Sequence, residues 1–175
     1  KILNPYLPMI WPQRLSTDHF DILALKKTNA DMGPLKLTYD DFKVGYKGSF
    51  TKSVTERDND MFGELSGDMN PIHFDDAVGR KLGFKGRVSN GFVQESRIAA
   101  ALIETFGSDD TIVVALEKNT RFLKPVYMDD EITATVEVVG RVPALRALKI
   151  KAGCVNGDGE QVVATNMTII IVSPK

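Results

Sequence analysis

The sequence has 175 residues, of which 43% are hydrophobic and 26% charged, and its formal net charge is −1. These values are typical of a globular domain with a core of its own, and the near-neutral charge argues against a nucleic-acid partner. No apolar run approaches the roughly 18 residues that cross a bilayer, so we expect no membrane association.

The first 36 residues differ from the rest, because four of the eight prolines lie there. Proline removes a backbone donor and restricts the residue before it, so regular structure is not expected. The segment also holds Tyr6, Trp11 and Phe20, which favours an arm packed on the body or on a neighbouring subunit. A linker from a longer polypeptide is the alternative. We therefore divide the chain into an arm, 1–36, and a domain, 37–175.

The domain is predicted to begin with a strand at 48–55 and a short helix. Thr55 is a good helix cap and is followed by acidic residues, while Gly67 is the usual stop signal. The apolar face of this helix is formed by Met61, Phe62 and Leu65.

The segment 68–74 is predicted to be irregular, because Asn70 precedes Pro71 and is pushed out of the helical region. A second short helix is expected at 76–82. The strongest helix prediction is 91–106, which is apolar over much of its circumference and is therefore expected in the core.

From residue 111 onward the apolar period changes to two, which is typical of strands. We expect strands at about 111–117, 118–127, 130–142, 145–155 and 161–172 in an antiparallel meander, which makes five strands if the first two are distinct and four if they are one. Asn156-Gly157-Asp158-Gly159 is a hairpin turn signal. One buried helix with an antiparallel sheet predicts an α+β fold in which the sheet curls around the helix, the hot-dog fold.

Cys154 is the only cysteine, so an internal disulfide is impossible within one chain. This fits a reducing compartment. Its apolar-alternating surroundings indicate a small buried hydrophobic residue rather than a nucleophile. We expect the protein to be cytoplasmic, with import into an organelle left open.

Asp68 and His73 are the candidate catalytic residues, because a carboxylate and an imidazole five residues apart in a loop can share proton transfers. Asn70 can orient either side chain or a water molecule. Gly91 opens the long helix, where unpaired amides and the helix dipole stabilise a growing negative charge on a bound oxygen. The residues alone also fit a plain Asx turn, a structural histidine and an ordinary helix-start glycine.

Three segments together resemble the signatures of the MaoC-like dehydratases, which include the (R)-specific 2-enoyl-CoA hydratases. Residues 66–75 (SGDMNPIHFD) resemble S-G-D-x-N-P-[LI]-H-x-D. Residues 88–92 (VSNGF) and 121–131 (RFLKPVYMDDE) are similar to the family's V-H-G-[ML] and F-L-K-P-V-x-x-G-D-E segments. The resemblance covers about 37–172, in the same order.

The resemblance implies a hot-dog homodimer that reversibly hydrates trans-2-enoyl-CoA to (R)-3-hydroxyacyl-CoA. It implies catalytic roles for Asp68 and His73, an orienting role for Asn70 and an oxyanion site at the Gly91 amide. The substrate carries either coenzyme A or acyl carrier protein. No metal and no cofactor besides the coenzyme A of the substrate is expected.

Two features depart from the family pattern. Asn90 stands where the family usually has His, which alters a side-chain contact but leaves the Gly91 amide in place. The arm at 1–36 has no counterpart in compact members. A thioesterase on the same fold, or a non-catalytic protein that binds acyl thioesters, is the alternative function.

Overall fold

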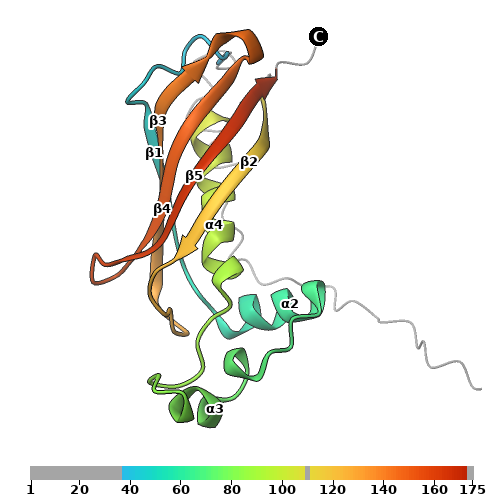
Figure 1. Cartoon of the computed structure of the whole chain (residues 1–175), viewed down its shortest axis with the longest axis vertical. Coiled ribbons are helices and arrows are strands. Elements are labelled where there is room, and N and C mark those ends of the chain that lie inside the picture. The colour runs from blue at the N-terminus through green and yellow to red at the C-terminus, as the bar shows by residue number, and fades with distance from the viewer. Residues whose placement is uncertain (1–36, 109–110, 173–175) are drawn as a thin grey trace, which may run out of the picture. The chain divides into compact units, whose positions relative to one another are not determined.

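The computed structural model describes residues 37–108 and 111–172, so the predicted arm at 1–36 lies outside the described residues. Five strands form one antiparallel sheet in the order β1-β3-β4-β5-β2 (Figure 1). Their bounds are Lys47–Ser53 for β1, Ile112–Phe122 for β2, Glu131–Val142 for β3, Ala147–Asn156 for β4 and Gln161–Val172 for β5.

The α-helices of the described residues lie between β1 and β2 in the sequence. They are α2 (Glu56–Ser66), α3 (Asp76–Lys81) and α4 (Gly91–Phe106), with the 3-10 turn η1 (Pro71–His73) between α2 and α3, and a second 3-10 turn, η2 (Pro143–Leu145), joins β3 to β4. Among the described residues, no helix combines the length and the apolar character that crossing a membrane requires.

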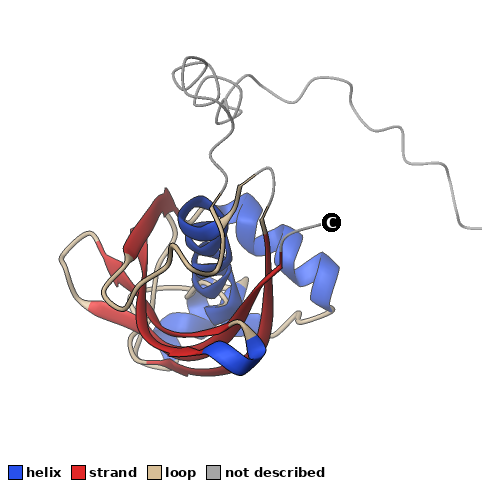
Figure 2. Ribbon diagram, turned by 90° about the horizontal axis from the view of Figure 1, so that it is seen from above, coloured by secondary structure: helices blue, strands red, loops and turns tan. Residues whose placement is uncertain are grey.

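The long helix α4 packs on the concave face of the sheet, which curves around it (Figure 2). Alternate residues of β3, β4 and β5 face α4 and are fully buried with Ile98 and Phe106 of that helix. The architecture is therefore the predicted α+β hot-dog fold, and α4 occupies the predicted residues 91–106. Cys154 is buried in this core, as predicted, and its burial raises the pKa of its thiol to about 12.

The helix α2 begins and ends where the sequence predicts. Thr55 accepts a hydrogen bond from the Asp58 amide, and the Asp58 carboxylate accepts one from the Thr55 amide, which completes a capping box. Gly67 ends α2 with φ of 77°, a conformation that glycine adopts without strain. These caps fix the direction in which the chain enters the loop after α2.

The predicted meander is wrong in one respect. Only β3, β4 and β5 follow one another across the sheet, whereas β2 lies at the far edge and pairs with β5. The expected strands 111–117 and 118–127 are one strand with an irregularity between Ala115 and Glu117. The crossover places β1 and β2 at opposite edges, a pairing that alternation within single strands does not specify.

The irregularity in β2 changes which residues face α4. Before it, Ala115 pairs with the fully buried Ile169; beyond it, Thr120 pairs with Thr165 and Phe122 with Val163, on the same inner face. Odd-numbered residues thus point inward before the bulge and even-numbered ones after it, because an extra residue shifts the alternation by one.

Two predictions about helix burial are also corrected. Of the three predicted apolar-face residues of α2, only Phe62 packs against the core, where it stacks on Phe92. Met61 and Leu65 are 55% and 85% exposed, and the fully buried residues of α2 are Asn59 and Gly63. The helix α4 is buried along one side but leaves Ile103 57% exposed on another. The segment 68–74, predicted as irregular, contains the single turn η1.

Candidate active site

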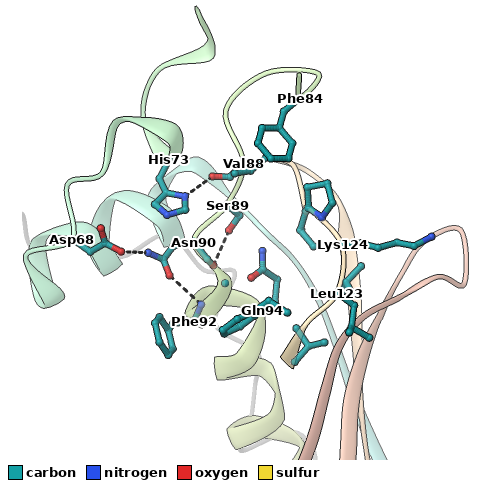
Figure 3. Close-up of a pocket in the computed structure, with 16 residues that line it drawn as sticks. Asp68, His73, Phe84, Val88, Ser89, Asn90, Phe92, Gln94, Leu123 and Lys124 are labelled. Atoms are coloured by element: carbon teal, nitrogen blue, oxygen red, sulfur yellow. Dashed lines mark hydrogen bonds between the residues drawn. The ribbon is translucent and has the colours of Figure 1, made fainter. Parts of the chain in front are cut away.

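A cavity of about 470 Å³ lies at the N-terminal end of α4, between the loop after α2 and the ends of β2 and β5 (Figure 3). It brings together three of the four predicted site residues. Its lining includes Asp68, His73, Asn90, Gly91, Phe122 and Val163.

The Asp68 carboxylate is held on both oxygens. Oδ2 accepts a hydrogen bond of 2.6 Å from Nδ2 of Asn90, and Oδ1 accepts one of 3.2 Å from the Asn70 amide. The side chain is half-buried at the cavity edge. Charge-assisted hydrogen bonds of this kind are shorter and stronger than neutral ones, so the carboxylate has a defined orientation.

His73 is fixed by the backbone of the segment opposite. Its Nδ1 lies 2.9 Å from the Val88 carbonyl oxygen, and the Val88 amide donates to the Ile72 carbonyl at 3.1 Å. A carbonyl oxygen can only accept, so Nδ1 is the donor and the neutral ring keeps Nε2 as an acceptor. The imidazole can therefore take a proton at Nε2.

Gly91 is the first residue of α4 and lines the cavity. The amides of the next two residues donate to Asn90, that of Phe92 to Oδ1 at 3.0 Å and that of Val93 to the carbonyl at 2.9 Å. Within the described part of the chain, no acceptor bonds the Gly91 amide. A Cβ at this position would lie 2.7 Å from the Phe122 ring, so glycine is required for the approach of this ring.

The inner part of the cavity is apolar except for one amide. Phe122, Val162 and Val163 form walls, and Phe92 stacks edge-on against Phe122 with ring centroids 5.6 Å apart. Gln94 is buried; with Nε2 turned toward the backbone it donates to the Gly91 and Asn90 carbonyls at 2.8 Å each. Its polar atoms are thus used within the protein, which leaves an apolar surface for an acyl group.

Three of the four predicted site residues line the cavity, and one does not. Asp68, His73 and Gly91 line the cavity, whereas the Asn70 side chain is exposed, accepts from the Ile72 amide at 3.5 Å and caps η1. Two further asparagines belong to the site. Asn90, predicted only as a departure from the family pattern, lines the cavity and donates to Asp68. Asn59, which no sequence pattern singled out, bonds the backbone of both His73 and Asn90. A polar residue on an amphipathic helix carries no signal that it is the buried one.

Lys124 lies at the cavity and forms an ion pair with Glu160. The hydrogen bond from Lys124, together with one from Asn156, lowers the pKa of the Glu160 carboxyl below its ordinary value. This cation is the only one among the lining residues described. It is the candidate for contact with a charged group of a ligand at the cavity mouth.

A sheet wrapped on one long helix, with a carboxylate and an imidazole facing the first turn of that helix, defines a hot-dog protein with a candidate acid–base site. The sequence profile described as the MaoC like domain matches residues 42–156, more than half of the chain. The chain therefore belongs to the MaoC-like domain family.

Relatives by sequence carry hydratase and dehydratase names. An (R)-specific enoyl-CoA hydratase of Rhodospirillum rubrum is 29% identical over 133 residues, which cover 76% of this chain and 90% of the relative. A mitochondrial 3-hydroxyacyl-[acyl-carrier-protein] dehydratase of Arabidopsis thaliana is 32% identical over 62% of this chain and 61% of its own.

A similar solved structure is the unliganded R-hydratase PhaJ1 of Pseudomonas aeruginosa. It shares 31% sequence identity with this chain, and the superposition has a TM-score of 0.68 over 79% of this chain and 86% of the other. The described domain is thus similar in both fold and sequence to this hydratase.

Proposed function

We propose that the protein is a hydro-lyase that reversibly hydrates a trans-2-enoyl-CoA to the (R)-3-hydroxyacyl-CoA. The observation that carries the proposal is the convergence of Asp68, His73 and the Gly91 amide on one cavity with an apolar interior. Family membership and the names of the relatives support the same reaction.

The chemistry assigned to the site is acid–base catalysis with electrostatic stabilisation. A water molecule held between Asp68 and His73 loses a proton to the pair as its oxygen bonds to the β-carbon. The pair returns one proton to the α-carbon, so that one water is added in total. The thioester oxygen gains negative charge during attack, and the unpaired Gly91 amide at the positive end of α4 stabilises it.

The assignment is tested by loss of the enoyl thioester absorbance of crotonyl-CoA, with chiral analysis of the product. Asp68→Asn and His73→Gln should each lower kcat by at least about 100-fold, because each removes one proton-transfer group. Asp60→Asn changes an exposed carboxylate of α2 and is the matched control. Activity like that of the wild type in either site variant contradicts the assignment.

A thioesterase and a non-catalytic acyl-binding protein are the competing functions. Release of free thiol from saturated butyryl-CoA, without hydration of crotonyl-CoA, identifies the first. Binding of both thioesters with no turnover identifies the second. Crotonyl groups presented on coenzyme A and on acyl carrier protein, compared at equal concentration, distinguish the two carriers by kcat/KM.

We also propose that the protein acts as a homodimer, paired through β2. This edge strand has a hydrogen-bonded neighbour on only one side in the described sheet, and Ile112 and Leu116 are 51% and 54% exposed. An exposed apolar edge is a site where another strand adds. Light scattering should give twice the mass of the chain, and Leu116→Lys should shift it toward the monomer; a wild-type monomer rejects the dimer.

A further inference from the structure

Asn59 is a buried side chain that touches both segments of the site without lining the cavity. It lies in α2 and is 2% exposed. Its Nδ2 donates to the His73 carbonyl at 2.8 Å, and its Oδ1 accepts from the Asn90 amide at 2.9 Å. A buried carboxamide gains little stability over an apolar residue of similar size, since both of its polar atoms must first be desolvated. Its distinctive property is that it fixes the separation of two segments.

Asn90 extends this connection to the carboxylate. Its Oδ1 caps α4 by accepting from the Phe92 amide at 3.0 Å, so its Nδ2 must point the other way, where it donates to Asp68 at 2.6 Å (Figure 3). The helix cap therefore determines which end of the Asn90 amide faces Asp68. In the same way, the Asn90 backbone amide determines that Nδ2 of Asn59 faces His73.

We propose that Asn59 and Asn90 are positioning residues that hold Asp68 and His73 in place from one anchor in α2. Asn59 restrains the backbone of His73, and Asn90 restrains the carboxylate of Asp68. The hydrogen bond from the Asn90 backbone amide to Oδ1 of Asn59 connects the two restraints, so that the carboxylate and the imidazole keep a fixed separation. This inference rests on the proposed hydratase activity, and it gives a role to Asn90, the residue at which the chain departs from the family signature.

Two substitutions separate positioning from plain structural support. Asn90→Ser keeps a good helix cap, but the serine side chain is one atom shorter, so its hydroxyl, held at the helix amides, does not reach Asp68 as Nδ2 of Asn90 does. Asn59→Asp keeps an acceptor for the Asn90 amide but places an oxygen against the His73 carbonyl. Thr105→Val is the matched control, because it removes a buried hydrogen bond, from Thr105 to the Ala101 carbonyl, at the opposite end of α4.

The measurements are kcat and KM for crotonyl-CoA, the Kd of butyryl-CoA and the melting temperature. Asn90→Ser and Asn59→Asp should lower kcat by about 10- to 100-fold, the usual effect of misplacing a catalytic group. KM and Kd should stay at their wild-type values, and the melting temperature of each variant should stay above the assay temperature, as that of Thr105→Val does. Asn90→His, which restores a donor, should recover more of kcat than Asn90→Ser.

The outcomes distinguish this inference from the proposed function. A wild-type protein that hydrates no enoyl thioester rejects the function. An active wild type that Asp68→Asn inactivates, while Asn90→Ser and Asn59→Asp keep full kcat, rejects only the positioning role. The same holds if kcat falls solely in proportion to the loss of folded protein. Should Asn59→Asp fail to fold, Asn90→Ser decides the question alone.

Discussion

The helices α2 and α4 differ in how much apolar surface they bury. The helix α4 buries apolar side chains such as Leu102 and Phe106 against the sheet, as its sequence predicts. The helix α2 leaves Leu65 in solvent and buries Asn59 and Gly63. The contrast shows that broad hydrophobic burial holds the scaffold together, whereas α2 is placed by polar contacts together with one aromatic contact, Phe62 on Phe92.

The close approach of α2 to its neighbours also indicates that a few specific contacts place this helix. A Cβ on Gly63 would lie 2.7 Å from the Phe74 ring, so glycine lets the loop that carries His73 lie against the helix. Arg97 of α4 also reaches Asp58 of α2 at 2.8 Å. The position of α2 thus depends on a few specific contacts rather than on a broad apolar face.

Among the substitutions that test this comparison, the largest loss of stability is expected from one in α4. Leu102→Ala removes a side chain that is 6% exposed in the core. We expect a loss of about 2–5 kcal/mol in the free energy of unfolding, from lost burial plus the cavity that remains. Urea unfolding followed by circular dichroism measures it. A loss below about 1 kcal/mol contradicts a core held by α4.

An intermediate effect is expected at the polar contact between the helices. Asp58→Asn weakens the capping box and removes the charge opposite Arg97, which should cost about 1–2 kcal/mol at pH 7. Urea unfolding measures the loss, with the exposed Asp60→Asn of the same helix as the control. Equal stability of the two variants contradicts a role for the contact in placing α2.

The same variant also has an expected pH dependence. Burial raises the pKa of Asp58, but the hydrogen bond from the Thr55 amide and the Arg97 guanidinium outweigh it, so the pKa in the folded protein lies below the ordinary 3.8. Stabilisation by a lowered carboxyl pKa is complete above the unfolded value and is lost as pH falls through the folded value. The stability difference between wild type and Asp58→Asn should therefore shrink below about pH 4. A difference independent of pH from 7 to 3 contradicts the charge contribution.

The smallest effect is expected from Leu65→Ala, the same substitution as Leu102→Ala but placed on α2. Leu65 is 85% exposed, so its removal should change the free energy of unfolding by no more than about 0.5 kcal/mol. The two Leu→Ala variants, unfolded side by side, test the comparison directly. A loss for Leu65→Ala that approaches the Leu102→Ala value indicates that Leu65 packs on the domain and contradicts the comparison.

Much of the fold could be predicted, because its elements carry local signals. Thr55 and Gly67 delimit α2, and alternation over β3, β4 and β5 follows from one face packing on α4. The edge position of β2 could not be predicted, since the pairing of strands distant in sequence leaves no trace in either strand. The exposure of Leu65 was missed because periodicity shows that a helix has an apolar face, not what covers it.

The candidate site could be predicted in part. Asp68, His73 and Gly91 lie in segments whose pattern singles them out, and all three line one cavity. The contacts of Asn59 depend on how α2 lies against two distant segments, which the sequence of α2 alone does not specify. Asn70, predicted to orient a side chain or a water molecule, lies outside the cavity lining: its side chain caps η1, and its backbone amide donates to Asp68.

The bulge between Ala115 and Glu117 has a consequence well beyond its own position. If β2 instead paired regularly through this point, with Leu116 opposite Thr168, every side chain downstream in β2 would exchange faces. Arg121 would then replace Phe122 beside Gly91, and a guanidinium would occupy the wall that an acyl chain is expected to contact. The apolar wall of the cavity thus depends on the bulge, because the bulged pairing of this edge strand places Phe122 rather than Arg121 at the N-terminal end of α4.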